Sequence, residues 1–361
     1  MSRIVRTSGA RVYGRAVVWT LLAALLVSGC ASTSGQLSAS SGPSGTAAPA
    51  PTGVCVVAGC AASNVTVFVE PDAGVTPVLQ AIRSASQSVW VEVYLMTDYD
   101  IIHALEDAAH RGVDVRVLLE MHPYGGGSVS AAQTQAELSA AGAQVEASDP
   151  AFRYTHEKAM IIDGSTAFIM TCNLSKSGLG GSSYTANREY GVIDNDPADV
   201  GLVKSVFVAD WNRTTPQLSD SRMIVSPVNA RSGIGALLSS AHNTVFIEDE
   251  EMYDQQSENL MIADAHRGVQ VEVLLPSSTA GNSPDVAWLK AGGVHVRFIK
   301  RPYMHAKLII VDGAVAFVGS ENFSSTSLDK NRELGIILSG SRALGVLSTT
   351  FSLDWSTGTA A

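Results

Sequence analysis

The chain has 361 residues, of which 46% are hydrophobic and 16% charged, and its formal net charge is −10. This length allows two domains of ordinary size or one double domain, each with a core large enough to fold. The excess of acidic residues argues against a general binder of nucleic-acid backbones, because such proteins present many Lys and Arg side chains to the phosphates.

The N-terminal residues have the composition of an export signal. Four arginines and no acidic residue precede an uncharged run, Ala16 to Gly29, that is too short to span a bilayer comfortably. The letters LVSG before Cys30 resemble a bacterial lipobox, which implies cleavage before Cys30 and a lipid on its thiol. We therefore predict a signal peptide at residues 1–29 and a lipoprotein on the outer face of the cell membrane. A secreted protein cut near Ala31 and an uncleaved anchor are the alternatives.

Residues 30–64 are predicted to be the lipidated cysteine followed by a linker. Ser, Gly, Ala, Thr and Pro dominate this segment as far as Gly53, so little of it can be buried. Cys55 and Cys60 lie five positions apart in a chain that we expect to be exported, and they can close a small disulfide loop. Cys172 is then an unpaired thiol that we expect to be buried.

The rest of the chain repeats itself. At an offset of 156 residues Glu92 matches Glu248, and at an offset of 149 His156 matches His305. We therefore predict two homologous halves, at residues 65–215 and 222–357.

Each half is predicted to follow one order of elements. A strand at 88–96, a helix, a strand at 113–120 and a second helix near 130–141 lead to a hairpin and a closing helix that ends in Asp-Trp. The second half repeats the pattern with strands at 243–252 and 269–276 and a helix at 284–291. This alternation predicts an α/β sandwich in each half.

The pattern His-x-Lys-x4-Asp-Gly occurs twice, in THEKAMIIDG and MHAKLIIVDG. Residues two apart in a strand share a face, so His156 and Lys158 point the same way, as do His305 and Lys307. An imidazole and an ammonium group therefore meet in one small volume in each half.

Asp163 and Asp312 end the two motifs, each directly before a glycine. Asp-Gly is a common two-residue hairpin turn, so a role in a turn or a buried salt bridge competes with a direct role in chemistry.

Further polar residues recur at fixed distances after the motifs, and they offer hydroxyls, amides and carboxylates to the same site: Thr171, Asn173, Glu189, Ser320, Asn322 and Glu333. The carboxylates are suited to accept a hydrogen bond from an imidazole and so fix its tautomer. If the halves face each other across a pseudo-two-fold axis, the set fits one tetrahedral phosphoryl group. Lysines, amides and hydroxyls would bind its oxygens, one histidine would attack phosphorus, and the other would protonate the leaving oxygen. No metal or other cofactor is required, and the lysine beside each histidine argues against a metal site.

These residues resemble the two H-x-K-x4-D motifs of the phospholipase D superfamily. The resemblance covers about residues 65 to 357 and includes Asn187-x-Glu189 and Asn331-x-Glu333. It implies a phosphohistidine intermediate, with His156 as the nucleophile and His305 as the acid and base. It also implies a monomer, because both motifs lie in one chain. One departure is Met170-Thr171, which stands where the second half has Gly319-Ser320.

The superfamily contains phospholipases, phosphatidyltransferases such as cardiolipin synthases, nucleases and inactive members. The predicted tether and the shortage of basic charge favour a phospholipid at a membrane surface, so our main hypothesis is a metal-independent phospholipase D that hydrolyses phospholipids. The first alternative is an extracellular endonuclease, because Lys300 and Arg301 stand just before the second motif. A phosphatidyltransferase ranks lower, since transmembrane helices would be expected before its catalytic halves. A binding protein on an inactive frame is the third alternative.

Overall fold

The computed structural model describes residues 53–124, 129–181, 185–218, 222–278 and 283–361. The predicted signal peptide, Cys30 and most of the predicted linker lie outside these residues and stay predictions. Among the described residues, no helix is both long enough and apolar enough to cross a membrane.

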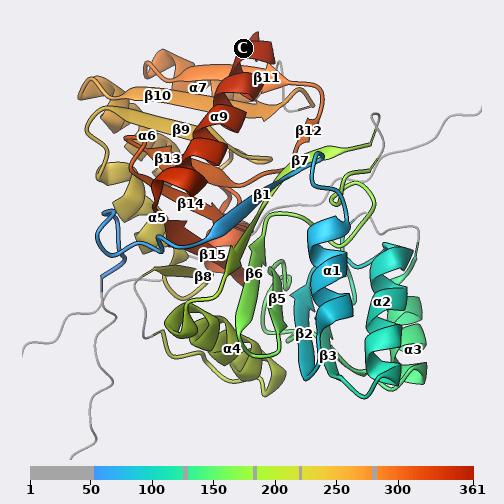
Figure 1. Ribbon diagram of the computed structural model, residues 1–361. Coiled ribbons are helices and arrows are strands. Elements are labelled where there is room, and N and C mark those ends of the chain that lie inside the picture. The colour runs from blue at the N-terminus through green and yellow to red at the C-terminus, as the bar shows by residue number, and fades with distance from the viewer. Residues whose placement is uncertain (1–52, 125–128, 182–184, 219–221, 279–282) are drawn as a thin grey trace, which may run out of the picture. The chain divides into compact units, whose positions relative to one another are not determined.

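The first half is a mixed sheet with helices on both faces (Figure 1). Its elements are β1 (Thr66–Glu70), α1 (Thr76–Ser84), β2 (Ser88–Val93), α2 (Tyr99–His110), β3 (Asp114–Leu119), α3 (Ala131–Ala140), β4 (Gln144–Ala147), β5 (Lys158–Ile162), β6 (Thr166–Met170), β7 (Asn187–Asp194) and α4 (Pro197–Trp211). The strand order is β1-β7-β6-β5-β2-β3-β4, in which β2, β3 and β4 are parallel and the remaining pairs are antiparallel.

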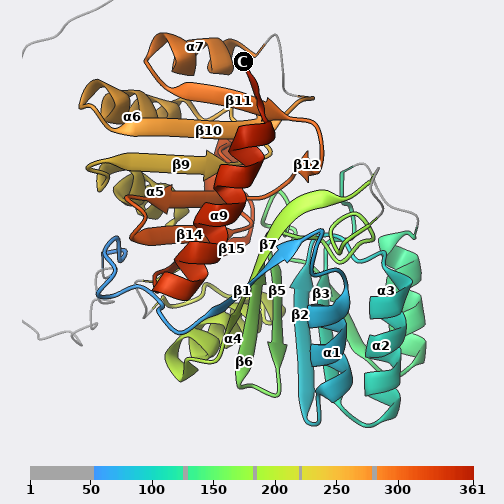
Figure 2. The same ribbon diagram turned by 45° about the horizontal axis from the view of Figure 1, so that its top comes forward.

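The second half repeats this arrangement (Figure 2). Its elements are β8 (Met223–Ser226), α5 (Ala230–Ser239), β9 (Thr244–Glu248), α6 (Gln255–His266), β10 (Gln270–Pro276), α7 (Pro284–Ala291), β11 (His295–Ile299), β12 (Tyr303–Met304), β13 (Leu308–Val311), β14 (Val315–Gly319), α8 (Ser325–Asp329), β15 (Glu333–Leu338), α9 (Ser341–Thr357) and β16 (Thr359–Ala360). The strand order β16-β11-β10-β9-β13-β14-β15-β8 places β8 where the first half has β1.

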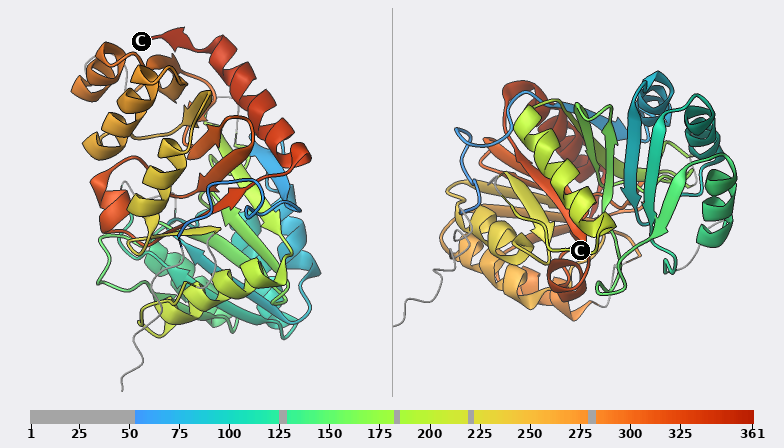
Figure 3. Two further views of the ribbon diagram at one scale, coloured as in Figure 1. Left: turned by 90° about the vertical axis from the view of Figure 1, so that its left-hand side faces the viewer. Right: turned by 90° about the horizontal axis from the view of Figure 1, so that it is seen from below.

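The helices divide between the outer and inner faces of the two sheets. Helices α1, α2 and α3 cover the face of the first sheet that is turned away from the second half, and α4 lies on the other face (Figure 3). One core cluster joins α4 and α9 to apolar residues of both sheets, including Phe207, Leu347, Ile161 and Ile310. Burial of this continuous apolar surface holds the halves together and so fixes the site between them.

Local sequence explains where the repeated helices begin and end. The side chains of Asp98 and Asp254 cap α2 and α6 by accepting hydrogen bonds from backbone amides of the first turn. Gly112 and Gly268 follow the same helices with φ of 84° and 91°, a conformation that glycine adopts without strain. These paired signals produce matching helices in both halves.

The sandwich halves are as predicted, including the helices α3 and α7, but several elements were not predicted from the sequence. They are β1, α1, β8 and α5, and the third parallel strands β4 and β11. The carboxylate-bearing strands β7 and β15 were also not predicted as strands.

The predicted linker is wrong for its last part. Cys55 and Ala61 are buried in the core of the second half, and Ala62 forms a bridge with Leu338 of β15. Cys55 and Cys60 are joined in a disulfide, and Cys172 is a buried free thiol. Residues 54–62 are therefore a folded strap on the second half.

Candidate active site

The two motifs run along strands β5 and β13. Their histidines stand shortly before the first residue of each strand, where the two halves meet. The backbone just before each motif pairs with the other half: β12 runs parallel to β7, and Thr155 forms a bridge with Arg332. The amide of His156 donates to the carbonyl of Arg332 at 2.8 Å. As a result, the start of each motif lies beside the strand of the other half that carries Glu189 or Glu333.

Each motif histidine is oriented by the glutamate of the opposite half. His156 Nδ1 lies 2.8 Å from Glu333 Oε2, and His305 Nδ1 lies 2.7 Å from Glu189 Oε1. Burial acts to raise the pKa of both glutamates, but the facing histidines and nearby lysines outweigh it, and both pKa values are lowered. The predicted orienting role of the glutamates fits this geometry. The sequence did not show that the contacts cross between halves.

Further side chains fix the two glutamates. Asn187 Nδ2 donates to Glu189 Oε1 at 3.0 Å, and Asn331 Nδ2 donates to Glu333 Oε1 at 2.9 Å. Ser327 Oγ adds a second bond to Glu333 at 2.7 Å. Such supporting bonds lock the carboxylates and, through them, the rings of the histidines.

The two lysines fold back on their own motifs. Lys158 Nζ donates to the His156 carbonyl at 2.5 Å, and Lys307 Nζ donates to the His305 carbonyl at 2.6 Å. Burial lowers the pKa of Lys158 to about 7. Burial also acts to lower the pKa of Lys307, but surrounding carboxylates, with Glu250 the strongest, outweigh it and raise that pKa.

Glu250 is a residue of the site that the sequence analysis missed. Its Oε2 lies 3.3 Å from His305 Nε2 and 3.2 Å from Lys307 Nζ, and Tyr303 Oη donates to its Oε1 at 3.1 Å. Burial acts to raise the pKa of Glu250, but His305 and Lys307 lower it to about 2. The carboxylate is therefore ionised beside the imidazole.

The first half has Tyr94 at the position of Glu250, at the same offset of 156 residues. Its ring packs edge-on against the His156 ring with centroids 4.7 Å apart, and Lys158 Nζ lies 5.4 Å from its centroid. This difference is present in the sequence as a mismatch between the repeats, whereas the predicted site residues are those that recur in both halves.

Thr171 and Ser320, which were predicted to bind phosphate, bond to the strands that carry the orienting glutamates. Both are fully buried, with 0% exposure. Thr171 Oγ1 donates to Glu189 Oε2 at 2.6 Å, and Ser320 Oγ accepts from the amide of Leu334 at 3.1 Å. The two hydroxyls support the carboxylate strands from behind.

Asp163 and Asp312 lie at hairpin turns away from the histidines, which corrects their predicted catalytic role. They lie at hairpin turns with φ of 50° and 52° and accept backbone amides of residues 86–88 and 242–244, respectively. Asp163 stands five residues beyond Lys158 along β5, roughly 16 Å at the rise of a strand. Both aspartates hold the far ends of the motif strands, as the turn interpretation proposed.

Asn173 and Asn322 remain candidates for binding phosphate. Among the described residues, their side-chain oxygens are buried without a hydrogen-bond partner. The backbone N–H of Asn322 donates to Ser327 Oγ at 2.9 Å. This places an amide side chain after the return strand in each half, next to the motifs.

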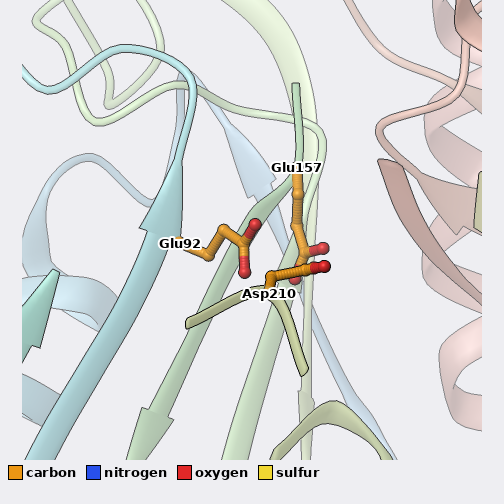
Figure 4. Close-up of side chains that lie close together, drawn as sticks. All are labelled: Glu92, Glu157 and Asp210. Carbon is orange, nitrogen blue, oxygen red and sulfur yellow. The ribbon is translucent and has the colours of Figure 1, made fainter. Parts of the chain in front are cut away.

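Three buried carboxylates, Glu92, Glu157 and Asp210, form a cluster with oxygens within 4.8 Å of one another (Figure 4), and Glu157 stands between the two motif residues His156 and Lys158. Arg332 crosses from the second half and binds both oxygens of Asp210, at 2.9 and 2.8 Å. Burial raises the pKa of all three carboxyl groups, and the nearby Asp210 adds to the rise for Glu92 and Glu157. Retained protons and the guanidinium therefore offset the charge, and the cluster ties Arg332 to the first half.

Two α/β sandwich halves that bring paired His-x-Lys motifs into one site define a phospholipase D fold. The chain belongs to this superfamily: the family model described as "Cardiolipin synthase, PLD-like domain" matches residues 78–211 and 234–355. The protein is therefore a phospholipase D superfamily enzyme.

Relatives agree with this assignment. A probable cardiolipin synthase YwiE of Bacillus subtilis is 23% identical over 334 residues, which cover 81% of this chain and 66% of that protein. Cardiolipin synthase B of Salmonella typhimurium is 27% identical over 310 residues, 72% of this chain and 73% of that protein. The chain thus spans about two thirds of the length of YwiE and 62% of the Halalkalibacterium halodurans cardiolipin synthase.

Solved structures share the fold at low identity. Phosphatidylserine synthase of Haemophilus influenzae has a TM-score of 0.65 and 11% identity, covering 83% of this chain and 88% of that chain. Polyphosphate kinase of Porphyromonas gingivalis also has a TM-score of 0.65, with 13% identity, covering 81% of this chain and 47% of that chain.

The hydrolytic phospholipase D expected from the sequence is contradicted by these comparisons. The relatives are named cardiolipin synthases, which favours the phosphatidyltransferase that we had ranked lower. Net charge and a predicted tether bear on where the substrate lies, and they do not distinguish water from an alcohol as the acceptor.

Proposed function

We propose that the protein is a phosphatidyltransferase of the cardiolipin synthase type. It would move a phosphatidyl group from one phospholipid to an alcohol on the head group of another. The observation that carries this proposal is similarity to cardiolipin synthases across both motif-bearing halves. The geometry supports it, because a two-step transfer needs one nucleophile and one acid-base group at the same phosphorus.

His156 is the nucleophile in this proposal. Glu333 engages Nδ1 and leaves Nε2 to attack. Burial lowers the pKa of His156 to about 4, so the imidazole is neutral near pH 7 and its lone pair is available. Attack forms a bond between Nε2 and phosphorus and breaks the ester bond to the first alcohol.

His305 is the acid and then the base. Its Nδ1 faces Glu189 and its Nε2 faces Glu250, so both nitrogens are in position to donate a proton. A proton from His305 completes the departing alcohol. In the second step His305 takes the proton of the incoming alcohol, whose oxygen bonds to phosphorus as the bond to His156 breaks.

The remaining charges suit the phosphoryl oxygens. Lys158 and Lys307 are buried beside the two histidines. Asn173 and Asn322 follow β6 and β14, which pair antiparallel with the motif strands β5 and β13 and so end near the start of each motif. Positive groups fixed in a dry site stabilise the negative charge that develops on non-bridging oxygens.

The test uses the full chain in detergent with vesicles of phosphatidylglycerol and EDTA present. We expect diphosphatidylglycerol and free glycerol in equal amounts, with phosphatidic acid as a minor product. Phosphatidic acid as the dominant product would overturn the transferase proposal. Intact lipid together with cleaved plasmid DNA in a parallel assay would show a nuclease instead.

A further inference from the structure

Glu250 places a negative charge where a phosphodiester enzyme binds anions. Its Oε2 lies within about hydrogen-bonding distance of the reactive nitrogen of His305, at 3.3 Å, and of Lys307 Nζ, at 3.2 Å. The corresponding position in the first half holds the neutral Tyr94. The carboxylate is therefore not required by the motif geometry, which both halves share.

Glu250 lies beside His305, where the alcohol reacts, and Tyr94 lies beside the nucleophile His156. In the proposed reaction the alcohol oxygen must come within hydrogen-bonding distance of His305 Nε2, because that atom gives and takes its proton. Glu250 is the carboxylate beside this atom, and about a quarter of its side chain, 24%, is exposed. It can thus be reached by a molecule that enters next to His305.

We propose that Glu250 is the specificity-determining residue for the alcohol: its carboxylate accepts a hydrogen bond from a second hydroxyl adjacent to the one that reacts. This inference rests on the proposed transferase function. A glycerol-type head group carries such neighbouring hydroxyls. The reacting oxygen would face His305 Nε2 while the neighbouring hydroxyl donates to Glu250.

The surroundings fit a fixed acceptor of this kind. Tyr303 Oη donates to Oε1 of Glu250 at 3.1 Å and Lys307 Nζ donates to Oε2 at 3.2 Å, so both oxygens of the carboxylate are held in place. A carboxylate oxygen has two lone pairs, so Oε2 can accept a hydroxyl of the alcohol in addition to the bond from Lys307. Tyr303 is itself partly exposed, at 37%, and is the first residue of β12, two positions before His305. An ionised carboxylate accepts a hydroxyl more strongly than a neutral group does.

The experiment compares two acceptors that differ by one hydroxyl, propane-1,2-diol and propan-1-ol, at equal concentration in one reaction. Phosphatidylglycerol vesicles supply the phosphatidyl group, and mass spectrometry gives the ratio of the two phosphatidyl alcohols. We expect the wild type to favour the diol and Glu250→Gln to lower the product ratio about tenfold, the difference between a charged and a neutral hydrogen bond. Glu250→Tyr, which copies the first half, should lower the ratio at least as far.

The control is Glu146→Gln, which removes one negative charge from an exposed position on β4 and should keep the wild-type ratio. A purely structural role for Glu250 would reduce both products equally, so an unchanged ratio in Glu250→Gln overturns the inference. If that variant makes neither product, Tyr303→Phe decides: a lowered ratio supports the inference, and an unchanged one overturns it. A wild type that transfers to neither alcohol would instead overturn the transferase proposal itself.

Discussion

The two halves of the site share their histidine, lysine, asparagine and crossing glutamate but differ in the residue beside the histidine. In the first half Tyr94 packs on His156, and in the second half Glu250 contacts both His305 and Lys307. This difference changes the charge around the two lysines. Burial lowers the pKa of Lys158, whereas Glu250 and other carboxylates outweigh burial and raise the pKa of Lys307. A duplicated frame can therefore assign different roles to identical motifs through one neighbouring side chain.

The largest expected effect comes from removing the two histidines separately. His156→Ala should lower kcat by at least about 10³-fold, because it removes the nucleophile, whereas His305→Ala removes the acid and base at a cost of about 10² to 10⁴. A p-nitrophenyl phosphodiester, whose leaving group needs no proton, should still modify His156 in His305→Ala. Intact-mass analysis followed by peptide mapping measures the adduct, and a modified His305 in His156→Ala would reverse the assignment.

The crossing glutamates provide the next comparison. Glu333→Gln and Glu189→Gln should each lower turnover of phosphatidylglycerol about 10- to 100-fold, the usual effect of losing a group that orients a histidine. Only the first-step defect of Glu189→Gln should recover with the p-nitrophenyl substrate, because Glu189 acts through the acid and Glu333 acts through the nucleophile. Equal recovery of both variants in the pre-steady-state burst of p-nitrophenol, which reports the first step alone, would show that the halves are not specialised.

The pH profile of kcat/KM tests the charge difference directly. Activity should rise with pH through about 4, as His156 loses its proton, and should fall through about 7, as Lys158 loses its own. Tyr94→Glu places a carboxylate beside Lys158 and should move the upper limb to higher pH by about one unit or more. Tyr94→Phe is the matched control, and an upper limb that stays in place in Tyr94→Glu would contradict the role given to Lys158.

The smallest expected effect on activity concerns the turn aspartates, where the two halves are alike. Asp163→Ala and Asp312→Ala should each lower the free energy of unfolding by about 1 to 2 kcal/mol, because several backbone amides lose their acceptor. Urea titration measures this loss, and turnover per folded molecule should change little. A large fall in kcat without a loss of stability would restore these residues to the catalytic set.

How much the sequence could predict depended on what recurs in it. His156, Lys158 and their counterparts were found because a repeated motif at strand spacing reports local geometry. The contact between His156 and Glu333 was not predicted, because spacing along the chain does not tell which half supplies a partner. The bond from Thr171 to Glu189 was not predicted for a related reason: periodicity identifies the face of a strand but not what already covers that face. Glu250 was missed because it breaks the repeat.

The crossed contacts between histidines and glutamates also bear on symmetry. A two-fold dimer of the first half alone would rebuild both contacts, since His156 of each copy would meet Glu189 of the other. Such a dimer must place the same residue at every equivalent position, so it would carry tyrosine beside both histidines and a carboxylate at neither of the positions equivalent to Glu250. A fused pair of halves is free of that constraint, so it can carry a carboxylate such as Glu250 beside one histidine and a tyrosine beside the other.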